Sequence, residues 1–215
     1  LKAIWIAATN PAVSLPDLHQ ARRALERAEL VIVQDPYHPT ETSRYAHLLL
    51  PAAQFSEKEG TSTNSERMVS FSERIVAPPG VARPDWEIVA EVGRRMGFPG
   101  FAFGTAAEVW DEFRGLTAGR PCEMTGITAE RLRRERHLQW PCPSEDHPGT
   151  PRLYPDMRFP TLDGRARFLP RPHLPPREMP DGEFPLVLTT GRIASQWHTR
   201  TRTGKVKQLV RAEPE

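Results

Sequence analysis

The feature that most constrains the fold is a pair of short apolar runs separated by a helical pattern near the start of the chain. Residues 3–9 (AIWIAAT) and 30–34 (LVIVQ) each have the length and apolar content of a buried strand. Between them, residues 17–28 repeat an apolar side chain every three or four positions. Two strands joined by one helix predict a β–α–β unit, in which the strands are parallel and the crossover is right-handed.

Further elements follow this unit and extend the same pattern. A third strand is expected over His47–Leu50, a loop over residues 55–67 and a β-ribbon over Met68–Val76. Asp85 is expected to cap a helix that runs to Met96 and buries Trp86, Val89, Val92 and Met96. A capping-box pattern at residues 105–108 opens another helix, and a third covers residues 128–136. The predicted fold class is therefore α/β, with a Rossmann-like, doubly wound and mostly parallel sheet.

Proline divides the chain into regions. The chain has 23 prolines among 215 residues, and 12 of them fall between His137 and Pro185. Because proline removes a backbone donor and breaks helices, residues 137–183 are expected to form an extended connector, with a short strand over residues 165–169. A new apolar strand is expected over residues 186–190. The predicted domains are thus residues 1–136, the connector 137–183, and the start of another domain over 184–215.

Charge and composition exclude several classes of protein. Lysine and arginine number 29 against 27 acidic residues, so the net charge of +2 gives no support to a nucleic-acid-coating surface. No apolar run reaches the roughly 18 residues of a membrane span. The two cysteines, Cys122 and Cys142, lie 20 positions apart, and we expect reduced thiols without a metal. The chain starts at Leu1, which suggests a piece of a longer protein.

Ligands of parallel sheets bind beyond the carboxyl ends of the strands. Those loops start here at Asn10 and at Asp35, and no G-x-G-x-x-G follows the first strand. A carboxylate at Asp35 can accept two N–H groups from the Watson–Crick edge of guanine. The alternative is that Asp35 accepts a backbone N–H in a turn before Pro36. Asn10 is equally interpretable as a turn residue and Lys58 as a solvated loop charge.

The segment after residue 188 has the composition of an anion site. Six basic and no acidic residues lie between Gly191 and Arg211, interleaved with hydroxyl side chains. Hydroxyl and guanidinium donors beside a glycine bend suit phosphate oxygens. A solvated basic turn and a nucleic-acid surface are the alternatives.

Five blocks taken together are similar to one enzyme family. TNPAVSLPD, QDPYHPTETSRYAHLLLPAAQFSEKEGTSTNSER, PPGVARPDWEI, QWPCP and LTTGRIASQWHTRTRTGK occur in order across the chain. The chain resembles the molybdopterin oxidoreductases, and within them the catalytic subunit of assimilatory nitrate reductases. The resemblance implies a segment from the later half of such a subunit, with much of its third, Rossmann-like domain and the start of its fourth, β-barrel-type domain.

The resemblance also implies which residues hold the cofactor, molybdenum bis(molybdopterin guanine dinucleotide). Asn10 would contact it, Gln34 and Asp35 would bind a guanosine, and Lys58 and Asp85 would add further contacts. Thr190 to Thr199 would wrap the phosphates and the pterin. The residues implied within that segment are Thr190, Gly191, Arg192, Gln196, Trp197, His198 and Thr199. No catalytic residue and no metal ligand is implied within this chain.

The parent enzyme implied by the resemblance reduces nitrate to nitrite by oxygen-atom transfer. It also carries a [4Fe–4S] cluster, whose cysteine motif is absent from these residues, so we expect the isolated chain to be inactive. The expected partners are nitrate and an electron donor (ferredoxin, flavodoxin or an NADH-linked protein), without nucleic acid or membrane. The expected compartment is the cytoplasm.

Two other functions stay open at this point. A formate dehydrogenase-like enzyme of the same family is one, since its distinguishing cysteine or selenocysteine would lie upstream. A non-catalytic nucleotide- or nucleic-acid-binding module is the other, and strongly salt-dependent affinity for single-stranded DNA would favour it.

Overall fold

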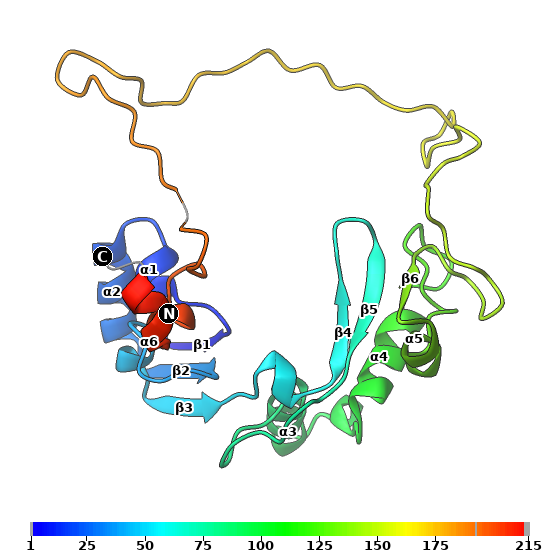
Figure 1. Ribbon diagram of the computed structural model, residues 1–215, viewed down its shortest axis with the longest axis horizontal. Coiled ribbons are helices and arrows are strands. Elements are labelled where there is room, and N and C mark those ends of the chain that lie inside the picture. The colour runs from blue at the N-terminus through cyan, green and yellow to red at the C-terminus, as the bar shows by residue number, and fades with distance from the viewer. Residues whose placement is uncertain (1, 192, 213–215) are drawn as a thin grey trace. The chain divides into compact units, whose positions relative to one another are not determined.

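The computed structural model describes residues 2–191 and 193–212. Contacts divide the chain into two units, Leu1–Leu153 and Tyr154–Glu215. All strands found in the described residues belong to the first unit, whose ribbon runs from blue to yellow-green in Figure 1. The domain limits expected at residues 136 and 183 refer to the fold of a longer chain, and they stay predictions.

The first unit contains a three-stranded parallel sheet in the order β1–β2–β3. Strand β1 (Ala3–Ala7) pairs with β2 (Leu30–Asp35), and β2 pairs with β3 (Leu48–Pro51). Helices α1 (Pro11–Ser14) and α2 (Leu18–Arg27) connect β1 to β2. The predicted parallel β–α–β unit is confirmed, and with it the α/β fold class.

Apolar side chains from these elements form one small core. Branched residues of β1 and β2 bury themselves against the two helices because a parallel sheet needs cover on its faces. The buried members are Ile6, Ala12, Leu25, Ala28, Val31 and Val33. This core holds the carboxyl ends of β1 and β2 next to each other, which positions the loops that follow them.

A second, antiparallel sheet has the order β4–β5–β6. Strand β4 (Gly60–Thr63) pairs with β5 (Met68–Ser72), and β5 pairs with β6 (His137–Gln139). The expectation of a loop over residues 60–63 was wrong, because polar Thr and Ser side chains are compatible with a partly solvated strand at a sheet edge. The expectation of a connector from His137 was likewise wrong for its first three residues.

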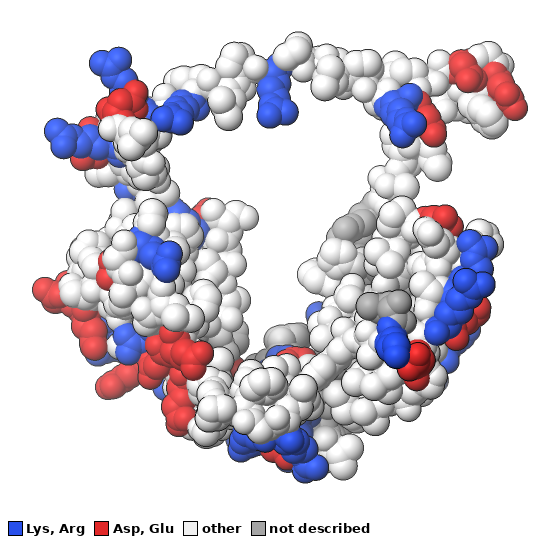
Figure 2. Space-filling model, turned by 180° about the vertical axis from the view of Figure 1, so that it is seen from behind, with Lys and Arg blue, Asp and Glu red and all other residues white. Residues whose placement is uncertain are grey.

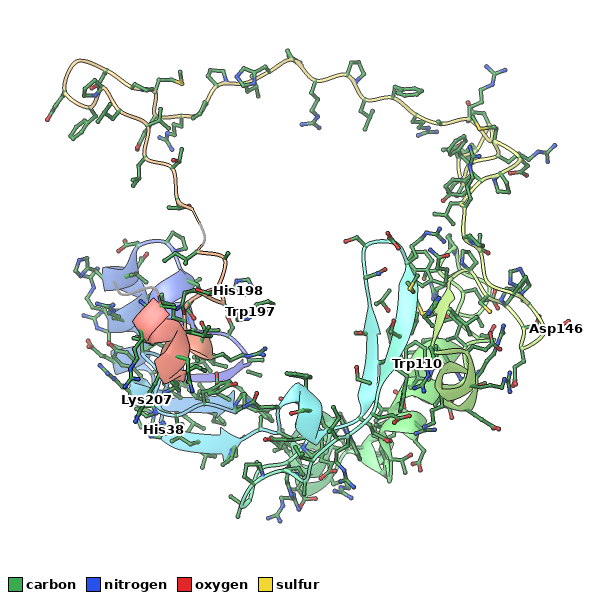
Figure 3. The ribbon with its side chains drawn as sticks, in the orientation of Figure 1. His38, Trp110, Asp146, Trp197, His198 and Lys207 are labelled. Atoms are coloured by element: carbon green, nitrogen blue, oxygen red, sulfur yellow. The ribbon has the colours of Figure 1, made fainter. Side chains whose placement is uncertain are left out.

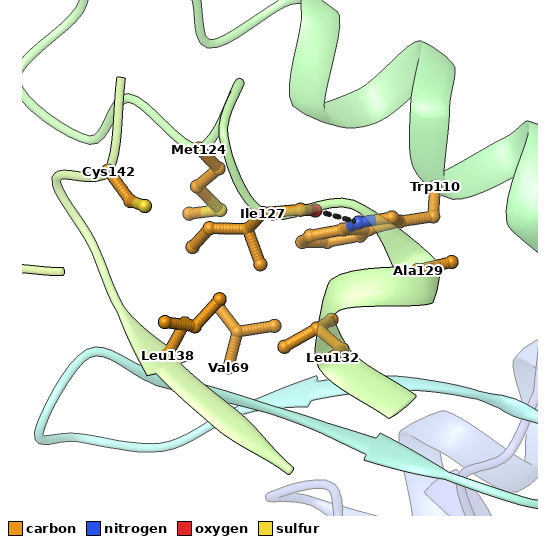
Figure 4. Close-up of a cluster of buried hydrophobic side chains, with 8 residues drawn as sticks. All are labelled: Val69, Trp110, Met124, Ile127, Ala129, Leu132, Leu138 and Cys142. Carbon is orange, nitrogen blue, oxygen red and sulfur yellow. Dashed lines mark hydrogen bonds between the residues drawn. The ribbon is translucent and has the colours of Figure 1, made fainter. Parts of the chain in front are cut away.

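Helices α4 (Ala106–Gly115) and α5 (Ala129–Glu135) pack beside this sheet around a second core, drawn in Figure 4. Its buried members are Val69, Trp110, Met124, Ile127, Ala129, Leu132, Leu138 and Cys142. The indole N–H of Trp110 donates to the carbonyl of Ile127 at 2.6 Å, so the largest side chain of the core has its polar atom satisfied.

The capping box predicted at the start of α4 is confirmed, and α5 has a side-chain cap that was not predicted. The Thr105 hydroxyl accepts from the backbone N–H of Glu108, and the Thr128 hydroxyl accepts from that of Arg131. The carboxylate of Glu108 accepts from the backbone N–H of Gly104, one residue before the capping position that the pattern predicted. Each cap satisfies N–H groups that a first helical turn leaves without an internal partner.

Helix α3 (Asp85–Arg95) occurs where expected, but its buried face and its start differ from the prediction. Ile88, Ala90 and Gly93 are its buried residues, whereas Val89 and Met96 are 45% and 67% exposed. The close approach of Phe101 to Gly93 explains the difference, because the ring covers the helix at its smallest residue. Pro84 is the capping residue, so Asp85 stands in the first turn and caps nothing.

The second unit contains little regular structure. Short helices η4 (Thr203–Lys205) and α6 (Lys207–Ala212) are its helical elements among the described residues. The strands expected over residues 165–169 and 186–190 are not formed, and Leu186 and Leu188 are 86% and 90% exposed. A strand needs a neighbour for its backbone hydrogen bonds, and the described part of this unit offers none. The expected β-barrel-type start is therefore not seen within residues 154–191 and 193–212.

No helix in the described parts of the chain combines the length and the apolar character that crossing a bilayer requires. Across the same residues, no cluster of three or more His, Cys, Asp or Glu side chains could hold a metal ion. Cys122 and Cys142 are both free thiols, as the sequence predicted.

Candidate functional site

The site begins where β1 and β2 end. Asn10 follows β1, and Gln34 and Asp35 close β2, so the parallel register brings the two loops to one edge of the sheet. Ala8 N–H donates to the carbonyl of Gln34 at 3.0 Å, which ties the end of β1 to the end of β2. The edge is the place where parallel sheets bind their ligands.

Asn10 is buried and its side chain joins the two loops. Its Nδ2 donates to a carboxylate oxygen of Glu41 at 2.8 Å. Its Oδ1 accepts from the Thr42 hydroxyl at 2.6 Å and from the Thr42 backbone N–H at 3.3 Å. The Thr42 hydroxyl in turn accepts from the Ala12 N–H at 3.1 Å, at the start of α1. Asn10 is thus an ordered link between loops as well as a turn residue.

The loop after β2 is stiffened by its own hydroxyl groups. Thr40 N–H donates to the Ser43 hydroxyl at 2.7 Å, and Ser43 N–H donates to the Thr40 hydroxyl at 3.0 Å. A ring nitrogen of His38 (labelled in Figure 3) lies 3.0 Å from the Ser43 hydroxyl. These residues were not among the predicted site residues, although the reciprocal spacing Thr40-x-x-Ser43 is a recognisable turn signal.

Asp35 makes the turn contact that was its alternative interpretation. Its Oδ1 accepts from the Tyr37 backbone N–H at 2.7 Å, two residues on. The side chain is half-buried at the end of β2. The hydrogen bond to Tyr37 fixes the plane of the Asp35 carboxylate. The contact of Asp35 with guanine stays a prediction.

Gln34, Lys58 and Asp85 come together from three separate segments. Gln34 Nε2 donates to Asp85 Oδ1 at 2.6 Å, and Lys58 Nζ forms an ion pair with Asp85 Oδ2. Asp85 therefore binds both partners instead of capping α3. Gln34 is 1% exposed, and its Oε1 is buried without a hydrogen-bond partner among the described residues. A buried amide oxygen of this kind can accept a hydrogen bond from a ligand.

The segment before Lys58 is held by a capping box that sequence reasoning missed. Helix η2 (Phe55–Glu57) starts after Gln54, whose N–H donates to the Glu57 carboxylate at 2.9 Å. The Tyr37 hydroxyl donates to Gln54 Oε1 at 2.7 Å, which links this segment to the loop after β2. The spacing Gln54-x-x-Glu57 was the available signal. The capping box and the Tyr37 contact therefore fix the segment that carries Lys58, whose side chain is 29% exposed.

In the second unit, residues 190–199 are described except for Arg192, which lies outside the described residues. Thr190 and Gly191 are exposed, whereas Gln196 is buried. The Thr203 hydroxyl donates to Gln196 Oε1 at 2.7 Å and accepts from the Trp197 N–H at 3.0 Å, which closes the bend between them. The hydroxyls of Thr199 and Thr201 are hydrogen-bonded at 2.8 Å.

Aromatic and cationic groups stack within this bend. The rings of Trp197 and His198 meet edge to face with centroids 4.8 Å apart. Both side chains are labelled in Figure 3. The guanidinium of Arg202 lies 5.5 Å from the centroid of the Trp197 ring. A cavity of about 250 Å³ nearby is lined by Gly204, Lys205, Lys207, Val210 and Arg211. These donors form a cationic surface that suits an anion.

Charge elsewhere is mixed. On the face drawn in Figure 2, acidic and basic side chains lie side by side over the first unit. Such interspersed charge is typical of a solvated surface. The basic bend of the second unit therefore stands out by its lack of acidic residues.

Known proteins are similar to almost the whole chain. Residues 1–95 match the family model described as molybdopterin oxidoreductase. The chain belongs to the molybdopterin oxidoreductase family. The nitrate reductase of Synechocystis is 50% identical over 98% of this chain and 30% of that protein. The periplasmic nitrate reductase of Desulfovibrio desulfuricans is 40% identical over 100% of this chain and 31% of that protein.

Two further relatives bear on the substrate. The assimilatory nitrate reductase catalytic subunit of Bacillus subtilis is 36% identical over 98% of this chain and 30% of that protein. The F420-dependent formate dehydrogenase subunit alpha of Methanocaldococcus jannaschii is 37% identical over 98% of this chain and 30% of that protein. The chain thus spans about 30% of the length of the curated relatives that it matches.

Proposed function

We propose that this chain is the cofactor-binding portion of a molybdenum-dependent nitrate reductase that reduces nitrate to nitrite. The family and the nitrate reductase relatives support this proposal. The observation that carries it is the convergence of Gln34, Lys58 and Asp85 at the ligand-binding edge of the parallel sheet. A buried amide, a cation and a carboxylate gathered there offer both donors and acceptors to a polar ligand.

The residues at this edge fit a molybdopterin guanine dinucleotide. The orphaned Oε1 of Gln34 accepts an N–H donor of the guanosine, and the Asp35 carboxylate accepts from the Watson–Crick edge of the base. Lys58 supplies positive charge for a phosphate or pterin oxygen, and Asp85 orients both Lys58 and Gln34. Asn10 contacts the cofactor from the loop after β1.

In the second unit, the segment from Thr190 to Thr199 binds phosphate and pterin groups of the cofactor. Backbone N–H groups and threonine hydroxyls donate to the phosphate oxygens, and Arg192 and His198 add charged or polar contacts. Gln196 and Thr203 hold the bend in which Trp197 and His198 stand.

When bound, the cofactor supplies molybdenum for oxygen-atom transfer from nitrate, while the protein binds and orients it. The parent protein also holds a [4Fe–4S] cluster through cysteines outside these residues, and a ferredoxin, flavodoxin or NADH-linked protein donates electrons. We place the parent in the cytoplasm, as an assimilatory role requires, although one nitrate reductase relative is periplasmic.

The intact protein that contains this segment tests the proposal. We expect the purified protein to contain molybdenum, to release guanine nucleotide on acid treatment and to reduce nitrate with a reduced viologen as electron donor. Protein without molybdenum and guanine nucleotide would refute the proposal. Strong, salt-dependent affinity for single-stranded DNA in its place would favour a nucleic-acid-binding module.

A formate dehydrogenase is the second candidate, because the relative from Methanocaldococcus jannaschii is as similar as several nitrate reductases. Oxidation of formate with a viologen acceptor, measured on the same preparation beside nitrate reduction, separates the two candidates. A molybdenum-loaded protein that oxidises formate and leaves nitrate unchanged would assign the second activity.

A further inference from the structure

The amide of Asn10 is held in one orientation by two residues of the neighbouring loop. Nδ2 donates to the Glu41 carboxylate at 2.8 Å, and Oδ1 accepts from the Thr42 hydroxyl at 2.6 Å. The partners lie 31 and 32 positions away in sequence, so the contact connects the loops that follow β1 and β2. Thr42 is fully buried.

The chemistry of these partners decides which way the amide faces. A carboxylate only accepts hydrogen bonds and a backbone N–H only donates them. If the Asn10 amide turned over, its oxygen would meet the Glu41 carboxylate and its NH₂ group would meet the Thr42 N–H. Both contacts would then be repulsive, so the observed orientation is the single one that satisfies all groups.

Thr42 connects this amide to α1 as well. Its hydroxyl donates to Asn10 Oδ1 and accepts from the Ala12 N–H at 3.1 Å. One buried hydroxyl therefore sets both the amide and the first turn of the helix beside it. Removal of the hydroxyl leaves the Ala12 N–H and the Asn10 oxygen each with one partner fewer.

We propose that Glu41 and Thr42 are positioning residues that preset the Asn10 amide for the molybdopterin cofactor. The inference rests on the proposed function and deepens it, because it names two residues that act through Asn10. A preset amide loses less rotational freedom when the cofactor binds, so retention of the cofactor depends on Glu41 and Thr42.

Substitutions in the intact protein separate orientation from mere packing. Glu41→Gln keeps the size of the side chain but can accept or donate, so one of the two residues that set the orientation of the Asn10 amide no longer selects it. Thr42→Val removes the hydroxyl and keeps the shape. We expect each variant to lose molybdenum and guanine nucleotide on the order of tenfold faster than wild type. Molybdenum per protein after timed dialysis is the measurement.

Two control variants complete the test. Thr42→Ser keeps the hydroxyl and should retain the cofactor as wild type does. Ser14→Ala removes an exposed hydroxyl that donates to the Asn10 carbonyl at 3.0 Å, and it leaves the amide untouched. We expect retention equal to wild type for both, and nitrate KM and kcat per molybdenum unchanged in Ser14→Ala.

The melting temperature of the cofactor-free protein provides a readout that a purely structural role would move. We expect Glu41→Gln to melt within about 2 °C of wild type, since its effect arises when cofactor binds. Wild-type retention in Glu41→Gln and Thr42→Val would overturn the inference. The inference would also be overturned if Thr42→Ser lost molybdenum and guanine nucleotide as fast as Thr42→Val. Absence of molybdenum and guanine nucleotide from wild type is a different result, which refutes the proposed function and the inference with it.

Discussion

Asp35 makes a turn contact, and under the proposed function its carboxylate would also bind guanine. Its Oδ1 accepts from the Tyr37 N–H, and asparagine at this position would keep a carbonyl oxygen for that bond. The other oxygen becomes an NH₂ donor, which opposes the N–H donors of guanine.

We therefore expect Asp35→Asn in the intact protein to retain about tenfold less guanine nucleotide, while the cofactor-free protein keeps its stability. Nucleotide released by acid, measured per protein, checks this expectation. Asp17→Asn, a conservative change at the exposed start of α2, is the matched control. Equal nucleotide content in Asp35→Asn and wild type would remove Asp35 from the site.

Cys142 predicts a dependence of stability on pH. Burial raises the pKa of its thiol, and the charge of nearby Arg131 opposes that shift in part. In the unfolded chain the thiol loses its proton near its ordinary pKa of about 8.5. Above that pH the unfolded state gains stability first, so the free energy of unfolding should fall as pH rises.

The measurement is the urea midpoint of tryptophan fluorescence between about pH 7.5 and 9.5, compared with Cys142→Ala. The variant should show a smaller decrease over this interval, because it lacks the titrating thiol. Parallel decreases in the two proteins would contradict the assignment.

At the scale of elements, the sequence predicted those strands, helices and caps that depend on neighbouring residues. The strands β1, β2 and β3, helix α2 and the cap of α4 depend on residues close in sequence. Strand β6 and the buried face of α3 could not be predicted, because they depend on β5 and on Phe101 covering Gly93. Asp85 shows the same limit, since its partners lie 51 and 27 residues away.

The cap of α5 gives a prediction at this scale. Thr128→Ala removes the hydroxyl that accepts from the Arg131 N–H at 3.1 Å. We expect about 1 kcal/mol of lost local stability, seen as roughly fivefold faster amide exchange over residues 128–136.

Thr105→Ala, the corresponding change at the cap of α4, should accelerate exchange in residues 105–115 and leave α5 unchanged. Unchanged exchange at α5 in Thr128→Ala would mean that packing of Leu132 alone defines the helix end.

For the whole molecule, the two units differ in how their side chains are covered. Every residue from Arg165 to Thr190 is exposed, and no helix or strand forms there. An exposed segment outside helices and strands is the first to be cut by a protease. The prolines favour an extended connector over residues 137–183, which stays a prediction, and the sequence could not predict what the strand expected over residues 186–190 would pair with.

We expect trypsin, applied briefly to the 215-residue chain, to cut first after Arg165, Arg167 and Arg177. Mass spectrometry of the early fragments should show an N-terminal piece that contains residues 1–153 whole. Arg165→Gln combined with Arg167→Gln should move the first cut to Arg177. Early cleavage within α4 or α5 would contradict the division into two units.

The meeting of Gln34 and Lys58 at Asp85 has a consequence for biosynthesis. The three side chains come from segments that a ribosome delivers one after another, and Asp85 is the last of them. A nascent chain that stops short of Asp85 has Gln34 and Lys58 but lacks the carboxylate that binds both of them. Under the proposed function, the cofactor would therefore find this edge complete only after translation has passed helix α3.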